Sequence, residues 1–308
     1  MPQIKVNHHA EVAGFFFIST DKRGEIARFP NLITNGGLDR MGGFADWLTW
    51  CQVGSGSTTP SVSDSALVNR VNGTNATSEN VNGIQSTEPY YTWRRKTFRF
   101  AQGTATGNLS EVGVGWLSSA GLFSRALILD AAGDPTTITI QSDETLDVTY
   151  EFRYYPKTTD DTGGITLTGN IGGTYDWVFR AMNVTFLNTG TGWSIDSPGN
   201  NQGVNANFGV GRAWFSGELG SLTGSPTGTL SDGPTNMSIS VASYSSGSYE
   251  RVFTLGAPLG SANFAGGIGG LAIKIGIGAF QVGFTPKIPK TSSDILSIVL
   301  KHSWGRRA

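Results

Sequence analysis

Similar short sequence segments recur in the same order in the two halves of this chain. This internal repeat, which we call the echo, limits the fold more than any other feature of the sequence. Phe98 and Asn108 lie in the first half, and Phe253 and Asn263 follow them at one shared spacing of 155 residues. Each Phe belongs to a strand-like run, and each Asn precedes an apolar residue and then a Gly-rich apolar run. The echo predicts that an internal duplication built the chain from two copies of one unit.

Length and composition favour two small β-rich units. A chain of 308 residues is long enough for two domains of about 150 residues each. Gly is abundant, at 43 residues, and only 15% of residues are charged, which favours turns and short strands over helices. We therefore predict an all-β fold of two tandem β-sandwich-like domains, residues 1–156 and residues 157–308. The run of Pro, Gly and short polar residues at 156–164 is the expected linker.

Each predicted copy ends on a segment with the alternation of a half-buried strand. Residues 146–154 place Leu, Val, Tyr, Phe and Tyr on one side and Asp, Thr, Glu and Arg on the other. Residues 296–304 repeat this pattern in the same phase, and an acidic residue, Glu144 or Asp294, precedes each segment. A period of two is typical of a strand with one buried face. We expect the two segments to be equivalent strands.

One short helix is predicted in the first copy. Its apolar residues recur at roughly helical spacing: Leu38, Met41, Ala45 and Leu48. Thr34 or Asn35 can cap its start. The second copy has no such segment, because its corresponding region, residues 188–203, is a loop-like run of Gly, Asn, Asp and Pro.

From the charge and hydropathy of the chain we predict that it neither binds nucleic acid nor inserts into a membrane. The net charge is −1, so no overall basic field exists, and we interpret the local clusters at 94–96 and 306–307 as strand ends or contacts to a partner protein. Residues 1–12 are polar and lack the apolar core of a signal peptide. The apolar stretch at 264–284 alternates with a period of two, which indicates a strand and not a spanning helix.

The reactive residue types form no convincing catalytic or metal-binding set. Cys51 is the only cysteine, so no internal disulfide can form, and its apolar context predicts a buried side chain. His8 and His9 are neighbours that point to opposite faces of a strand, and we expect them in an exposed terminal segment. His302 falls on the apolar face of the last strand, where we expect it to be packed. We predict no catalytic residues, no cofactor and no metal site.

Paired acids and a Gly-rich loop are the remaining candidates for chemistry. The acids at 143–144 lie at a turn and those at 160–161 lie in the expected linker, where adjacent carboxylates are usually solvated, so they do not predict a glycosidase. The loop at 54–60 lacks the Gly-Lys-Ser/Thr ending of a phosphate loop.

Tryptophan is the residue type that keeps a carbohydrate-binding hypothesis open. Most of the 8 tryptophans should be buried anchors. Trp193 lies in a run of Gly, Thr and Ser, so we expect it to be exposed. Trp193 and Trp214 are therefore the candidate glycan contacts.

Several short sequence motifs in the first copy, which we call phrases, together resemble a known protein family. The phrases occupy residues 29–39, 51–61, 64, 67, 95–100, 108–113, 122–128 and 145–155. Their order resembles that of tailed-bacteriophage virion proteins of the tail-fibre, collar-appendage and baseplate type. The resemblance spans about residues 24–156, and the second copy keeps the strand phasing but loses the phrases at 54–57 and 123–128.

The resemblance implies a structural component of a virion that acts by assembly. Such proteins are made in the host cytoplasm without a leader, form homo-oligomers that are often trimers, and contact other virion proteins. We expect residues 1–156 to dock on the particle and residues 157–308 to face outward or contact a neighbouring subunit. The alternatives are a receptor-binding module that recognises host surface glycan and, less favoured, a polysaccharide depolymerase.

Overall fold

In the computed structural model the regular structure is almost entirely β-strand. The described residues are 4–43, 47–187, 192–193, 212–232, 235–275 and 278–307. They contain a single α-helix and several β-sheets, which confirms the predicted all-β class. No helix in the described ranges has the length and apolar character needed to cross a membrane.

The helices are α1 (Asn35–Gly43) and the short 3-10 helix η1 (Gly169–Ile171). The strands of the first half are β1 (Ile4–Thr20), β2 (Gly24–Pro30), β3 (Leu32–Ile33), β4 (Trp50–Gly54), β5 (Arg70–Thr74), β6 (Thr77–Gln85), β7 (Tyr91–Phe100), β8 (Gly107–Leu109), β9 (Glu111–Gly115), β10 (Leu122–Leu127), β11 (Ile138–Ile140) and β12 (Leu146–Tyr155). The strands of the second half are β13 (Asp161–Leu167), β14 (Gly173–Ala181), β15 (Arg212–Phe215), β16 (Leu230–Asp232), β17 (Ser238–Val241), β18 (Glu250–Ala257), β19 (Ile268–Ile275), β20 (Gly278–Ile288) and β21 (Leu296–Arg306).

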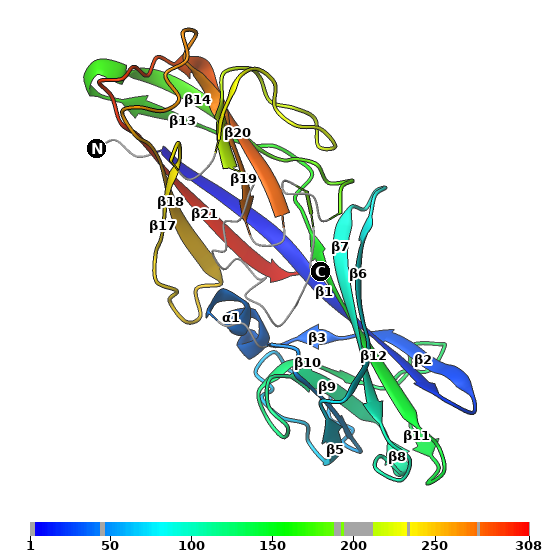
Figure 1. Cartoon of the computed structure of the whole chain (residues 1–308). Coiled ribbons are helices and arrows are strands. Elements are labelled where there is room, and N and C mark those ends of the chain that lie inside the picture. The colour runs from blue at the N-terminus through cyan, green and yellow to red at the C-terminus, as the bar shows by residue number, and fades with distance from the viewer. Residues whose placement is uncertain are drawn as a thin grey trace.

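One large sheet runs the length of the molecule and forms one layer of a sandwich (Figure 1). Its order is β17-β18-β21-β1-β12-β7-β6, and β2 pairs with β1 beside this path. The facing layer is divided into a sheet of order β3-β10-β9-β4-β5 and a sheet of order β13-β14-β20-β19-β15-β16. Strands β8 and β11 form a separate ribbon.

Strand β1 joins the two halves. It pairs antiparallel with β12 and parallel with β21, so strands from both halves lie in one sheet. Its even-numbered residues face both smaller sheets. His8 stacks on Phe179 of β14 at 4.6 Å, whereas Phe16 packs at 5.0 Å from Tyr150, which in turn meets Phe123 of β10. The buried apolar residues of both halves form one continuous core.

The two halves repeat a strand order. In the first half β12-β7-β6 faces β10-β9-β4-β5, and in the second half β21-β18-β17 faces β20-β19-β15-β16. The pairing register of the two ladders differs by two residues. Val148 lies opposite Phe98, but its counterpart Ile298 lies opposite Leu255, two residues beyond Phe253, the counterpart of Phe98. This shared order is the arrangement that an internal duplication would leave.

The strand alternation is confirmed, and the linker is shorter than expected. In β12 and β21 the predicted apolar residues are buried at every second position. Residues 161–164 belong to β13 and pair with β14, so only residues 156–160 connect the halves. The ring of Trp177 lies in the space that a Cβ of Gly163 would occupy, which accounts for a glycine inside this strand. The loop expected at 188–203 lies outside the described residues, apart from residues 192–193.

The predicted helix exists in a shorter form. The Gly37 N–H donates to Thr34 Oγ1 at 2.8 Å, so Thr34 caps α1 as expected. Leu38 and Met41 are buried, but the helix ends at Gly43, and Leu48 is buried beyond it. Ala45 lies outside the described residues.

Candidate binding surface

The candidate glycan contacts are both buried, so the expectation that Trp193 is exposed is wrong. Trp193 is 1% exposed, and its indole N–H donates to the Met182 carbonyl at 2.8 Å. Its ring packs between Tyr154 and Phe280. Trp214 is also fully buried. The polar neighbours of Trp193 give no sign of this burial, because strands that are distant in the chain impose it. Neither ring is placed to stack on a sugar.

The histidines lie as expected at two of three positions. His8 is buried, contrary to the prediction of an exposed segment, because β1 is a central strand and not a free terminus. His9 points to the opposite face and is exposed. His302 is packed as predicted, and its Nε2 shares a hydrogen bond of 2.7 Å with the Tyr154 hydroxyl. Burial holds the pKa of His302 well below its ordinary value.

Cys51 is buried as predicted, and burial raises the pKa of its thiol. In the described ranges, no group of three or more His, Cys, Asp and Glu side chains is arranged to hold a metal ion.

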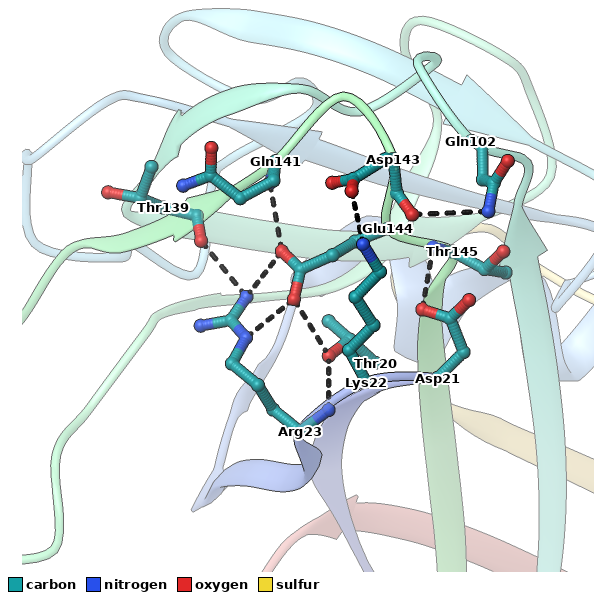
Figure 2. A network of polar contacts seen from close by, with 10 residues as sticks. All are labelled: Thr20, Asp21, Lys22, Arg23, Gln102, Thr139, Gln141, Asp143, Glu144 and Thr145. Carbon is teal, nitrogen blue, oxygen red and sulfur yellow. Dashed lines mark hydrogen bonds and ion pairs between the residues drawn. The ribbon is translucent and has the colours of Figure 1, made fainter.

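The acids at 143–144 form part of a polar network that joins two turns (Figure 2). Glu144 is buried at 3% exposure, which corrects the expectation of a solvated turn. Arg23 explains this burial: its Nε and Nη2 donate to the two carboxylate oxygens at 2.7 and 2.9 Å. Arg23 therefore lowers the pKa of Glu144, and the Gln141 N–H assists at 2.8 Å. Asp143 pairs with Lys22, so the network clamps the β1–β2 turn to the β11–β12 turn.

The acids at 160–161 are also bound to cations. Asp160 forms a bidentate pair with Arg180 at 2.7 Å for both contacts. Asp161 pairs with Lys157 and lies 3.5 Å from Nδ1 of His8. These contacts fasten the connection between the halves and leave both acids engaged in ion pairs.

A buried cluster of charged side chains is formed by residues from several of the phrases on which the family resemblance rests. Arg125 and Glu111 are fully buried and pair at 2.9 Å. Arg125 also donates to Asp64 at 2.7 Å and to the Thr58 carbonyl at 2.8 Å. Glu111 accepts backbone N–H bonds from the same loop, including Gly56 at 3.0 Å. The cluster therefore fixes the loop between β4 and β5 to the sheet.

Sequence reasoning missed this cluster. Glu111 and Arg125 were visible as opposite charges in apolar runs, a pattern that favours a buried pair. What the sequence did not supply was the pairing of β9 with β10, which brings the two side chains together.

Beside the candidate glycan contacts, a different candidate for a functional surface is the outer face of the large sheet, on the side away from both smaller sheets. We call it the arginine–aromatic face. Its rings are Phe15, Phe17, Tyr91, Trp93 and Tyr155. Its guanidinium groups are those of Arg28, Arg95, Arg153 and Arg307.

Rings and guanidinium groups alternate across this face. The Arg95 guanidinium lies between Phe17 at 5.4 Å and Trp93 at 4.8 Å. Arg153 lies between Phe15 at 4.1 Å and Tyr91 at 4.6 Å. Such cation–π contacts contribute about 0.5–1 kcal/mol each at exposed sites. The alternation holds the long arginine side chains in fixed positions on the sheet.

One carboxylate lies beneath the centre of the face. Glu151 is 1% exposed and pairs through its two oxygens with the Nε atoms of Arg95 and Arg153. The arginine side chains reach solvent to different degrees: Arg28 is 63% exposed, Arg95 is 42% exposed and Arg153 is 21% exposed. At its centre the face therefore presents positive charge to solvent above a buried acid, while at its edges the exposed Glu25 and Glu11 pair with Arg28 and Arg307.

A groove borders the face where β12 ends. It has a volume of about 440 Å³ and is lined by residues that include Tyr155, Lys157, Thr158 and Arg307. Arg307 covers the Tyr155 ring at 4.0 Å and pairs with Glu11 at 3.2 Å, which places this cation between the groove and the face.

Comparisons with known proteins add no relative to this description. A scan against protein-family models, a search of curated proteins and a search of solved structures each returned no match.

Proposed function

We propose that this chain is a structural component of a tailed-phage virion, in the tail, collar or baseplate and fibre region, and that it acts by assembly with other virion proteins. The observation that carries the proposal is the Arg125–Glu111 cluster. The residues of this cluster come from the phrases that resemble phage virion proteins. They lie together in the interior, where they hold a loop in place, and they do not line a cleft. A motif of this kind preserves a scaffold, which suits a protein that works by being held in place.

The contact between the halves supports a rigid building block. Asp39 of α1 accepts hydrogen bonds from Tyr244 and Ser246 of the β17–β18 loop, both at 2.8 Å. The Trp304 indole N–H donates to the Leu38 carbonyl at 2.8 Å. Together with the shared strand β1, these bonds fix α1 of the first half against the second half. A rigid body transmits load and position between its neighbours.

The proposal retains the expectations of a homo-oligomer, of a docking role for residues 1–156 and of no catalytic residues. The arginine–aromatic face lies almost entirely on this first half, which favours docking there.

The test is incorporation of the chain into particles. Particles are purified on a density gradient from producing cells, and the chain is quantified by mass spectrometry in the particle band and in the soluble fraction. We expect a fixed copy number per particle across independent preparations. A chain that remains in the soluble fraction, or that varies freely in amount between particle preparations, would refute the proposal.

A further inference from the structure

The second half provides an internal control for the arginine–aromatic face. Strands β7 and β12 pair as β18 and β21 do, so the outer side chains can be compared position by position. Where the first half pairs Arg153 with Trp93, the second half pairs Ser303 with Glu250. The next outer pair is Glu151 with Arg95 in the first half and Lys301 with Val252 in the second.

This comparison separates what the sheet needs from what the face adds. The second half forms the same antiparallel ladder with small, aliphatic and singly charged residues on its outer side. Rings and stacked guanidinium groups are therefore not required to build the sheet. None of Phe15, Phe17, Tyr91 and Trp93 belongs to the hydrophobic core. Their place on the face calls for a different explanation, and Trp, Tyr and Arg are the residue types enriched at the centres of protein interfaces.

Trp93 is held as a flat platform. Its ring covers Gly83 of the neighbouring strand β6, and a Cβ at that position would collide with the ring. Gly83 thus lets the indole lie down on the sheet, where Arg95 stacks against it at 4.8 Å. A ring that lies against the surface of the sheet suits an extended partner surface better than an enclosed small ligand.

The charged groups of the arginine–aromatic face indicate the chemistry of the partner that would bind there. At the centre of the face the carboxylate of Glu151 is buried, whereas the guanidinium groups bonded to it reach solvent. Arg28 adds a further exposed cation at the edge, where it pairs with the exposed Glu25 at 3.2 Å. A partner that presents carboxylates beside aromatic or apolar side chains complements this arrangement, because carboxylates accept from guanidinium groups in a bidentate manner.

We propose that the arginine–aromatic face is a protein-docking surface whose occupant is an acidic, aromatic-bearing segment of another protein. This inference rests on the proposed assembly function and names the surface and the partner chemistry that would serve it.

The test uses a chemically defined probe and the full chain. Fluorescein-labelled random copolymer of glutamate and tyrosine is titrated with the protein at low salt, and binding is followed by fluorescence anisotropy. A lysine–tyrosine copolymer and polygalacturonate serve as comparison probes. We expect the glutamate–tyrosine copolymer to bind, and we expect Arg28→Glu and Trp93→Ala each to weaken binding by about tenfold.

The matched control is Lys301→Glu. Lys301 is a cation on the same side of the large sheet in the second half, and it makes one exposed ion pair, with Glu250 at 3.2 Å, as Arg28 does with Glu25 at 3.2 Å. We expect this variant to bind as the wild type does. Because Arg28 is exposed at the edge of the face, its substitution leaves folding intact even if Trp93→Ala perturbs it.

Several results would overturn the inference. These are absence of copolymer binding, equal loss of binding in Lys301→Glu, and tighter binding of polygalacturonate, which would indicate a surface for acidic sugar. Self-association that Arg28→Glu abolishes, without copolymer binding, would identify a second copy of the chain as the occupant. A chain that enters particles but fails this test refutes only the docking surface, whereas one that binds the copolymer but stays out of particles refutes only the virion role.

Discussion

Glu144 and Asp294 occupy the same position in the two halves of the molecule. Each accepts a hydrogen bond from the backbone N–H three residues earlier in the turn before the last strand, Glu144 from Gln141 at 2.8 Å and Asp294 from Thr291 at 2.9 Å. The backbone N–H of each acid also donates to the carbonyl of that earlier residue at 3.2 Å. The turn is therefore repeated in detail, which is the result expected from a duplicated unit.

The two turns differ in what else their acid binds, and this predicts unequal sensitivity to mutation. Glu144 also holds Arg23 and Thr20 of the β1–β2 hairpin, and the Arg23 contact is a bidentate ion pair, whereas Asp294 bonds to Thr291 of its own turn and to the neutral side chain of Asn170. We expect Glu144→Ala to lower the urea midpoint of unfolding more than Asp294→Ala does. Equal midpoints would mean that the network in Figure 2 adds nothing to the capping of the turn.

The buried pair of Arg125 and Glu111 predicts a large loss of stability when one partner is removed. Arg125→Ala leaves the fully buried Glu111 carboxylate without its cation, and breaking such a pair costs about 3–5 kcal/mol. We expect this loss in chemical denaturation, together with faster proteolysis of the loop between β4 and β5.

The control for this prediction is Arg99→Ala. Arg99 forms a bidentate pair with Asp147 at 2.8 and 2.6 Å, but its side chain is 53% exposed. Surface pairs contribute at most about 1 kcal/mol. A cost for Arg125→Ala no greater than for Arg99→Ala would contradict the structural role given to the cluster.

Adjacent glycines of α1 predict opposite effects of the same substitution. A Cβ on Gly42 would collide with the ring of Tyr244 in the second half, whereas one on Gly43 would lie 3.4 Å from that ring. We expect Gly42→Ala to destabilise the fold by about 1–3 kcal/mol through overpacking. Gly43→Ala should be neutral or stabilising by up to about 1 kcal/mol, because Ala favours the helix. Thermal unfolding of both variants gives the comparison, and a neutral Gly42→Ala would argue against the close contact between the halves.

The buried histidines predict acid sensitivity. Burial lowers the pKa of His8 and His302 from the ordinary value of 6.5, so both are neutral in the folded protein at neutral pH. A group with a depressed pKa that is neutral when folded binds more protons in the unfolded chain. Its contribution is therefore complete above pH 6.5 and is lost as the pH falls below that value. Asp161 beside His8 opposes the shift of His8, which makes His302 the stronger contributor.

The measurement is the free energy of unfolding as a function of pH. The wild type should lose stability on acidification from neutral pH, and His302→Gln, which can keep a hydrogen bond to Tyr154 but does not titrate, should show a shallower slope. Identical slopes would show that His302 is not buried in its neutral form.

The parts of the fold that local patterns determine were predictable from sequence. The alternation in β12 and β21, the capped helix at Thr34 and the buried thiol of Cys51 depend on neighbours within a few residues, and the structure confirms them. The burial of Trp193 was not predictable in this way, because strands distant in sequence impose it.

The arginine–aromatic face was hidden for the same reason. Phe15 and Phe17 alternate with buried residues on β1, but only the register of β1, β12 and β7 shows that Arg153 and Trp93 lie beside them. A single sequence supplies the composition of a face but not the pairing that assembles it.

Hydroxyl-radical footprinting of the chain, free and in purified particles, tests the central claim most directly. Trp93 is the probe, and Trp177 is the matched control, because it is half-buried and lies over Gly163 as Trp93 lies over Gly83. The account predicts that the chain is present in the particles and that oxidation of Trp93 falls there while oxidation of Trp177 is unchanged. Absence of the chain from particles, or equal oxidation of Trp93 in the two states, would contradict it.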